Sequence, residues 1–438
     1  MGTPGRRYSE SHPWITFRID LQRAGADFWM LLGEARSKVD HLSVALLKPA
    51  VAEEMHQVYL AKGAQATTAI EGNQLTEEEV VEIVAGRAAP PPPSQEYQRR
   101  EVENVLAAFN RITNDLLAGG SAVLTVEGIC QFDRDVLSGL EEDDVRPGEI
   151  PGARGSVVVG SYRGAPREDC AYLVARLCDW LNGSDFDLPG DGYRVPYALI
   201  KAICAHLYVA WIHPFDDGNG RTARLMELQI LLAAGVPMPA AHLLSNHYNS
   251  TRAEYYRELR RASESGGDVV PFLRYAVQGF VDGIRAQVER VWAQQYADRW
   301  EQFVYETFGR VVTEAERRRL HLALELSKQA GPVLRRNIAS LSTELTLAYA
   351  GTERMLRAYA GRAASRAACA FLNAMRPLAS WRRARWFSSF FDQRIRIARF
   401  RLSHEWVAST TQRRARQPGV RTFSAISSPR ARMCGVSS

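Results

Sequence analysis

The sequence predicts an all-α protein in which one short β-hairpin interrupts the helices. Apolar residues recur at helical spacing through most of the first 350 residues, as expected for helices that each bury one face. Only residues 145–166 break this rhythm, with Gly and Pro around a β-branched run at Val157, Val158 and Val159. Such a run between turn residues is typical of a small hairpin.

Residues 1–100 are predicted to form a helical N-terminal region. The apolar face of one helix in this region comprises Met55, Val58, Tyr59, Ala66 and Ile70. Gly72-Asn73 tolerates the left-handed backbone that ends a helix. Thr76 and Glu79 have the spacing of a capping box and therefore predict the start of a second helix, which runs to Gly86. Pro90–Pro93 then predicts a stiff linker or a long surface loop.

Residues 101–290 are predicted to form the main helical core. The helices expected there span residues 101–117, 124–137, 169–181, 196–211 and 221–234, with Pro196 at a first helical position. Further helices are expected to about residue 350, so the fold class is a helical bundle with a hairpin.

Composition excludes several classes of protein. The chain has 438 residues with 46% hydrophobic and 24% charged residues, which is typical of a globular protein. No uninterrupted apolar stretch reaches the 18 or so residues of a membrane span, and the N-terminus lacks the apolar run of a secretory signal. The 6 cysteines form no C-x-x-C pair, which favours reduced thiols and a cytoplasmic location over a disulfide framework or structural zinc.

The net charge of +6 is unevenly distributed. Residues 351–438 contain many arginines, no lysine, and only Glu353, Asp392 and Glu405 as acids, whereas acids exceed bases in the preceding 350 residues. Three interpretations of this arginine-rich tail remain open: a segment that binds nucleic acid, a disordered basic tail, or out-of-frame translation of a GC-rich gene.

Residues 213–221, HPFDDGNGR, separate the two most hydrophobic predicted helices. The unpaired N–H groups at the start of the second helix, together with its dipole, form an anion site. Gly218 and Gly220 let the backbone approach a phosphate closely. Arg221 and Arg224 lie three residues apart on one helical face and can add a charge-assisted clamp.

The same segment supplies a metal ligand and a base. Asp217 offers a hard oxygen suited to a magnesium ion that also holds phosphate oxygens. His213 has an unperturbed pKa that suits a general base near neutral pH. A capped helix junction with a buried histidine is the structural alternative, but the combination of phosphate, metal and base features favours a nucleotide site.

Residues 213–224, HPFDDGNGRTAR, resemble the H-P-F-x-D/E-G-N-G-R-x-x-R signature of the Fic (filamentation induced by cAMP) family. The resemblance implies the Fic fold and transfer of AMP from ATP to a hydroxyl side chain of a target protein, with Mg²⁺. It implies that His213 deprotonates the hydroxyl and Asp217 binds the metal. The residues implied to hold the nucleotide phosphates are Gly218, Asn219, Gly220, Arg221 and Arg224.

Residues 67–73, TTAIEGN, resemble the S/T-x-x-x-E-G/N motif of the autoinhibitory helix of this family. The resemblance implies that Glu71 pairs with Arg224 and occupies the site of the ATP γ-phosphate. It also implies that Glu71 could position water to remove AMP from a modified target. An exposed glutamate ahead of a glycine stop is the structural alternative.

Three further features resemble the family. The hairpin with Val157, Val158 and Val159 resembles the flap that pairs with the target backbone, and a plain surface hairpin is the alternative. Arg252, Tyr255 and Tyr256 resemble a stretch near the nucleotide, so these tyrosines are candidates for the nucleotide pocket or for the helical core. Asn104 matches a recurrent, structural position of the family.

The sequence thus predicts an autoinhibited protein adenylyltransferase with ATP and a protein target as partners. Its regions are the N-terminal 1–100 with the inhibitory helix, the Fic core 101–290, a partial winged-helix-like segment at 291–350, and the tail at 351–438. The alternative function is a DNA-binding regulator that uses the Fic core as a sensor. The sequence leaves open the target, a homodimer and nucleic-acid binding, and it predicts no membrane association.

Overall fold

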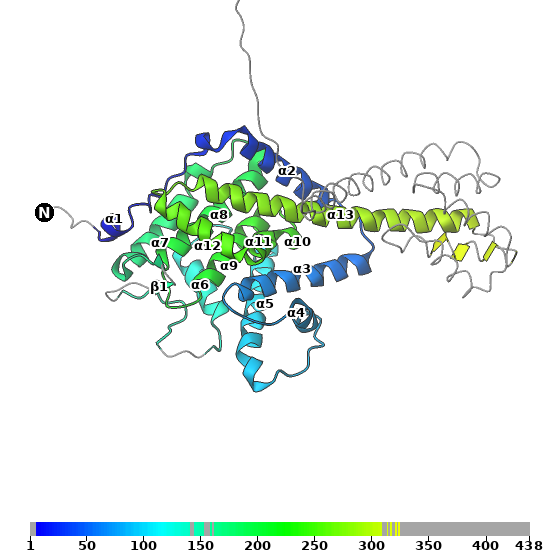
Figure 1. The fold of residues 1–438 in the computed structure, drawn as a ribbon, viewed down its shortest axis with the longest axis horizontal. Coiled ribbons are helices and arrows are strands. Elements are labelled where there is room, and N and C mark those ends of the chain that lie inside the picture. Colours follow the sequence, from blue (N-terminus) through cyan, green and yellow to red (C-terminus); the bar gives the residue numbers. More distant parts are fainter. Residues whose placement is uncertain are drawn as a thin grey trace, which may run out of the picture. The chain divides into compact units, whose positions relative to one another are not determined.

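The computed structural model describes residues 6–140, 144–152, 158–159 and 162–308, together with residues 313, 316–317, 320–321 and 323–324. Most of the described residues are helical, and the two described strands form one antiparallel hairpin (Figure 1). The predicted fold class is therefore confirmed. Val157 and the arginine-rich tail at 351–438 lie outside the described residues.

The helices and strands follow one another in a simple order along the chain. The elements up to the hairpin are α1 (Tyr8–Ser11), α2 (Gly25–Ser43), α3 (Pro49–Ala69), α4 (Glu77–Val84), α5 (Glu96–Leu117), α6 (Val126–Val136), β1 (Val158–Val159) and β2 (Tyr162–Arg163). The later elements are α7 (Arg167–Leu181), α8 (Arg194–Ile212), α9 (Asn219–Ala233), α10 (Met238–Ala241), α11 (Leu243–Ser250), α12 (Arg252–Glu264) and α13 (Val270–Phe308). Short 3₁₀ turns precede α2, α5 and α8 and follow α7.

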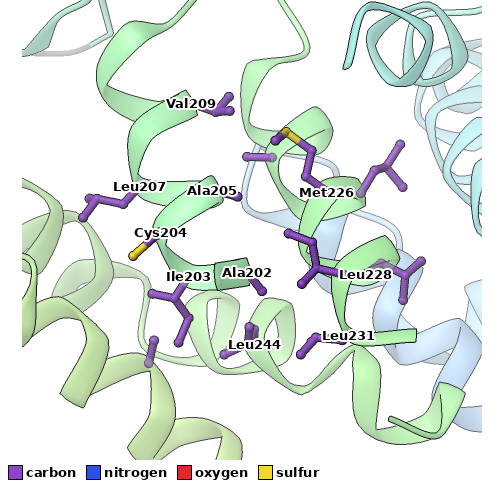
Figure 2. Packing of buried hydrophobic residues seen from close by; sticks show 14 of the residues in the cluster. Ala202, Ile203, Cys204, Ala205, Leu207, Val209, Met226, Leu228, Leu231 and Leu244 are labelled. Atoms are coloured by element: carbon purple, nitrogen blue, oxygen red, sulfur yellow. The ribbon is translucent and has the colours of Figure 1, made fainter. Parts of the chain in front are cut away.

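Helices α8 and α9 form the centre of the core. Nearly every residue of α8 is buried, as expected for a helix that is apolar on all sides. In Figure 2, Ala205 and Val209 of α8 point toward α9, and Met226 of α9 points back toward α8. Small residues on α8 let the two helix axes approach closely, so this pair holds the loop between them, residues 213–218, in a fixed place.

The apolar character of α8 also satisfies the length and composition of a membrane span. The one such segment among the described residues is Asp191–Ile212, and 83% of its most apolar window is buried inside the protein. Burial of this kind is what the core helix of a globular protein shows.

Three earlier helices surround the start of α9. Helices α5 and α6 both pack against α9, and α3 packs against α4, α5 and α11. Figure 1 shows α3, α4 and α5 next to one another along one side of the helical core. The turn that follows α3, residues 70–75, is thereby brought to the first turn of α9 although about 150 residues separate them in the chain.

The predicted starts of the five core helices differ from the observed starts by two to five residues, and α8 and α9 show two of the physical reasons. Helix α8 begins at Arg194, so Pro196 is not its first residue, because a 3₁₀ turn at Asp191–Tyr193 leads directly into the helix. Helix α9 begins at Asn219 and not at residue 221, because left-handed Gly218 serves as its N-cap. Gly220 therefore lies inside the first turn.

The chain divides into two compact units, Met1–Tyr296 and Ala297–Ser438. The predicted boundary at residue 291 falls inside helix α13, which continues to Phe308. In the second unit, Trp300 donates a hydrogen bond from Nε1 to the Ala323 carbonyl at 3.0 Å. The remainder of the predicted winged-helix-like segment lies mostly outside the described residues.

The predicted capping box at the start of α4 is present. The Thr76 hydroxyl accepts a hydrogen bond from the Glu79 N–H at 3.2 Å, and the Glu79 carboxylate accepts one from the Thr76 N–H at 2.8 Å. Both bonds satisfy N–H groups that the helix itself cannot pair.

Replacing this cap should weaken the N-terminal unit measurably. We expect Thr76→Ala to lower the free energy of unfolding by about 1 kcal/mol, because an N-terminal donor loses its acceptor. Urea unfolding followed by circular dichroism measures this difference. Glu78→Ala, an exposed neighbour outside the box, is the control and should change stability by no more than a few tenths of that value. Equal effects of the two substitutions would contradict the assigned role.

Candidate active site

His213 lies at the end of α8 in a left-handed backbone conformation. Its φ is 51° and its ψ is 61°, and its N–H donates to the Val209 carbonyl at 2.8 Å. Non-glycine residues rarely adopt this conformation, which costs of order 1 kcal/mol. The conformation turns the chain sharply out of α8, so that His213 opens the loop instead of extending the helix.

The pKa of His213 is shifted downward, which keeps the imidazole neutral but makes it a weaker base. Burial lowers the pKa to about 4, although the nearby carboxylate of Glu71 opposes the shift. The imidazole is therefore neutral at pH 7 and able to accept a proton. The charged groups that act on the imidazole are Glu71 and Asp217, and the role of His213 as a base stays a prediction.

Asn219 holds the loop in shape. Its side-chain oxygen accepts a hydrogen bond from the Phe215 N–H at 2.9 Å, and its side-chain nitrogen donates to the Phe215 carbonyl at 2.9 Å. Phe215 in turn is buried in the core. The amide of Asn219 thus stabilises the conformation of the loop, and its predicted contact with phosphate stays a prediction.

The glycines of the loop make room for two carboxylates. Gly218 has φ 77°, and a Cβ there would lie 2.6 Å from Oδ1 of Asp133. A Cβ at Gly220 would overlap the carboxylate of Glu71. At both positions the group close to the glycine is a carboxylate of the same protein, and the predicted approach of a phosphate stays a prediction.

Asp133 of α6 was not predicted from the sequence. It is fully buried, accepts a hydrogen bond from the Gly148 N–H at 2.7 Å, and receives a long contact from the Thr222 hydroxyl at 3.5 Å. Burial raises its pKa to about 7, with Asp217 contributing in the same direction. The buried carboxyl of Asp133 thus packs against Gly218, the N-cap of α9.

Arg221 is buried between two carboxylates. Its Nη1 donates to Oε1 of Glu101 at 2.6 Å, and its Nη2 pairs with Asp217 four residues earlier. The arginine side chain is 3% exposed, so the charge requires partners. Glu101 of α5, another residue that sequence reasoning missed, supplies the buried one, while Asp217 remains partly exposed.

The acid next to Asp217 has a different partner. Asp216 pairs with Arg167 at the start of α7, with 2.6 Å between Oδ1 and Nη2. Of the two consecutive aspartates, Asp217 is thus the one whose oxygens face the arginine and phosphate region. The metal role of Asp217 stays a prediction.

Arg224 receives Glu71 from the turn after α3. Its Nη2 pairs with the Glu71 carboxylate and donates to the Thr67 carbonyl at 2.9 Å. The arginine side chain is 1% exposed and that of Glu71 is 33% exposed. Burial opposes ionisation of Glu71, but the guanidinium of Arg224 outweighs it and holds the pKa of Glu71 below its usual value. The expected ion pair is therefore formed.

Buried donors remain at this point without a protein partner. Among the described residues, Nε and Nη1 of Arg224 and Nε of Arg221 are buried and make no hydrogen bond. An unsatisfied buried donor costs about 1–3 kcal/mol, more when it is charged. Donor groups left in this state beside a helix N-terminus are suited to an anion.

The hairpin is anchored next to His213. Val158 pairs with Arg163 and Val159 with Tyr162 in antiparallel register. The Tyr162 hydroxyl donates to the Trp211 carbonyl at 2.8 Å, and the Ala165 N–H donates to the Ile212 carbonyl at 3.1 Å. These bonds connect the end of the hairpin directly to the last turn of α8, so the predicted flap lies beside the predicted base.

The two candidate tyrosines differ from one another. Tyr255 is buried, and its hydroxyl lies 2.8 Å from Nε2 of His206, which makes it part of the helical core. Tyr256 is 42% exposed. Burial, with a smaller effect of Glu71, raises the pKa of Tyr256. Of the pair, Tyr256 is therefore the one available to a nucleotide.

Asn104 has the structural role expected of it. Its amide donates to the carbonyls of Val136 at 3.2 Å and Ser138 at 2.7 Å, which fixes the end of α6 against α5. Since α6 carries Asp133, this contact also helps to place the support of the loop.

Comparison with known proteins gives the family of this segment. Residues 123–231 match the Fic/DOC family. They form a Fic domain. The matched residues include α6, the hairpin, α7, α8 and nearly all of α9, which is the framework that places His213 and the two arginines.

The chain is also similar to named adenylyltransferases. It is 30% identical over 213 residues to protein adenylyltransferase fic-1 of Caenorhabditis briggsae, covering 48% of this chain and 38% of the relative. It is 31% identical over 206 residues to protein adenylyltransferase Fic of Drosophila willistoni, covering 47% of this chain and 37% of the relative. The chain thus spans less than half the length of these curated relatives.

A solved structure supports the fold. A Fic family protein from Desulfovibrio desulfuricans G20 superposes with a TM-score of 0.50 and 22% sequence identity, covering 73% of this chain and 90% of that one. The similarity extends beyond the matched Fic segment, and so the surrounding helices share the arrangement.

The donor set of the Fic domain can be tested for a metal. No cluster of three or more His, Cys, Asp or Glu side chains in the described part of the chain is placed to hold a metal ion. Mg²⁺, however, usually takes one or two carboxylates together with phosphate oxygens and water. Asp217, whose side chain is 39% exposed, fits that pattern as a single protein ligand beside a phosphate site.

The pKa of His213 in the Fic domain can be measured directly. We expect its ring signals in an NMR titration to stay constant from pH 8 to pH 5.5, because burial keeps the imidazole neutral at those values. In the urea-unfolded protein the same residue should titrate near pH 6.5. The spectrum of His213→Gln assigns the signal. A midpoint near 6.5 in the folded protein would show that the site does not shift this group.

Proposed function

We propose that this protein is an autoinhibited protein adenylyltransferase that transfers AMP from ATP to a hydroxyl side chain of a target protein. The observation that carries the proposal is the pair of buried arginines, Arg221 and Arg224, with unpartnered donors at the N-terminus of α9. The similarity to named adenylyltransferases supports the same reaction.

The arginines and the start of α9 suit the triphosphate of ATP. The first-turn N–H groups have no acceptors within the helix, and the helix dipole is positive there. Arg221 and Arg224 add two full charges within one turn. In a site largely closed to water, such fixed charges stabilise the negative charge of a phosphoryl-transfer transition state strongly.

His213 is the proposed base. Neutral at pH 7, it takes the proton from the target hydroxyl as the hydroxyl oxygen forms a bond to the α-phosphorus. The bond between the α-phosphorus and the bridging oxygen of the β-phosphate breaks, and pyrophosphate leaves with that electron pair. Arg221 and Arg224 stabilise the charge on the transferred and leaving groups. When bound, Mg²⁺ held by Asp217 would further neutralise the phosphates.

Glu71 is the proposed inhibitory residue. Its carboxylate pairs with Arg224 and lies against Gly220, where it takes up positive charge that the γ-phosphate of ATP needs. Because the pKa of Glu71 is held below its usual value, the carboxylate stays ionised throughout the neutral range. Inhibition by this contact should therefore persist at neutral pH and weaken only in acid.

The hairpin offers a way to hold the target. Its anchoring to Trp211 and Ile212 brings an antiparallel edge next to His213, and strand addition to such an edge holds a peptide largely through its backbone. No contact among the described residues supports the alternative of a DNA-binding regulator. A domain that acts only as a sensor would not need a base such as His213 beside the two arginines.

Removal of Glu71 should activate the enzyme. We expect Glu71→Gly to incorporate label from α-³²P-ATP into itself or into lysate proteins at least about tenfold faster than wild type, because a charge-assisted contact worth about 1.4 kcal/mol or more no longer competes with ATP. Glu71→Gly combined with His213→Ala is the matched control and should incorporate none.

The same assay can reject the proposal. If Glu71→Gly incorporates no more label than the double variant, the proposal that this chain is an adenylyltransferase is wrong. Label that is lost from the target in the presence of wild type but not of Glu71→Gly would indicate that Glu71 also supports removal of AMP.

The pH dependence of the activated variant tests the base. With a pKa near 4, His213 is neutral at both pH 6 and pH 8, and loss of Glu71 removes a contribution that raises this pKa. The rate of Glu71→Gly should therefore be nearly equal at the two values. A base with the ordinary pKa of about 6.5 would lose about fourfold between pH 8 and pH 6, and such a loss would contradict the assignment.

A further inference from the structure

Asn73, two residues after Glu71, attaches the inhibitory turn to a second helix. Its side-chain nitrogen donates to the Gln98 carbonyl at 2.7 Å and to Oε2 of Glu101 at 2.9 Å, while its oxygen accepts from the Leu75 N–H at 3.0 Å. The residue is 8% exposed. The side-chain nitrogen of Asn73 therefore donates twice to α5, and the side-chain oxygen accepts one hydrogen bond from within the turn.

Glu101 connects Asn73 to Arg221 of α9. One oxygen accepts from Asn73 and the other from Nη1 of Arg221 at 2.6 Å. The carboxylate is buried, with the residue 5% exposed, and a buried carboxylate with two such partners is costly to separate from either. Asn73 and Arg221 thus share one acceptor.

The inhibitory turn consequently reaches α9 by two routes. Glu71 contacts Arg224 directly, and Asn73 reaches Arg221 through Glu101. Between the two residues lies Gly72, whose φ of 108° is open to glycine and strained for other residues. If the whole turn moves so that Glu71 leaves Arg224, the Asn73 amide has to break its hydrogen bonds to the Gln98 carbonyl and to Glu101.

We propose that Asn73 is a positioning residue of autoinhibition, which holds Glu71 on Arg224 through its bonds to α5. This rests on the proposed function of the site. Loss of the Asn73 amide frees the turn while Glu101 and Arg221 remain paired, so that inhibition weakens and the capacity for transfer is retained. Loss of Glu101 should instead lower the capacity for transfer, because Glu101 positions Arg221 itself.

The test compares Asn73→Ala with its neighbour Gln74→Ala in two backgrounds. In the wild-type background, Asn73→Ala should raise the rate of AMP incorporation several-fold, to a value below that of Glu71→Gly, and Gln74→Ala, whose exposed side chain makes none of these bonds, should not. In the Glu71→Gly background, Asn73→Ala should have no further effect, since nothing remains to be released.

Glu101→Gln separates positioning of the turn from positioning of the arginine. It keeps an oxygen that can accept from Asn73 but removes the charge opposite Arg221. In the Glu71→Gly background we expect it to lower kcat several-fold, whereas Asn73→Ala leaves kcat unchanged. If Asn73→Ala lowers kcat there as well, Asn73 is part of the scaffold and the proposal is wrong.

A structural measurement keeps the proposal independent of activity. Hydrogen exchange of a peptide that spans residues 70–76 should be several-fold faster in Asn73→Ala than in wild type or Gln74→Ala, because the turn opens more often. If Glu71→Gly shows no transfer, the proposed function fails and exchange alone decides on Asn73. If Glu71→Gly is active while Asn73→Ala matches wild type in both rate and exchange, only the role of Asn73 is overturned.

Discussion

Two arginines, one turn apart near the start of α9, are buried, and the helices around them supply the acids that pair with them. A guanidinium out of water needs hydrogen-bonded counter-charges, and Arg221 and Arg224 obtain them from three separate parts of the chain. Glu101 comes from α5, Glu71 from the turn after α3, and Asp217 from the loop itself. The packing of α3 and α5 on α9 is the structural condition for this arrangement.

The counter-charges differ in how easily they can be exchanged. Glu101 is buried and has a second partner in Asn73, so it serves as a permanent partner of Arg221. Glu71 and Asp217 are both partly exposed, and each can give way to a phosphate or engage a metal ion. The site thus combines one fixed acid, which keeps the helix start assembled, with two acids at the surface that a nucleotide could replace or recruit.

The sequence predicted the parts of the site that are contiguous in the chain. The loop between α8 and α9 carries its residues in fixed spacing, and the turn at Glu71 is marked by its own short motif, so both were recognisable. Glu101, Asp133 and Arg167 were not assigned roles, and Asn73 was assigned only to a helix stop, because their partners lie 15 to 120 positions away and are brought to them by packing that no local pattern encodes. Helix starts were misplaced where a 3₁₀ turn or a left-handed glycine leads into the helix.

Gly220 lies next to Glu71 in space although the two residues are far apart in the chain. A Cβ at position 220 would lie 2.0 Å from Oε1 of Glu71, so a side chain there requires the partly exposed Glu71 carboxylate to move from its place beside Arg224. Conversely, a chain that keeps this acid has little freedom at position 220. A side chain larger than glycine at position 220 is therefore expected to weaken the contact between Glu71 and Arg224.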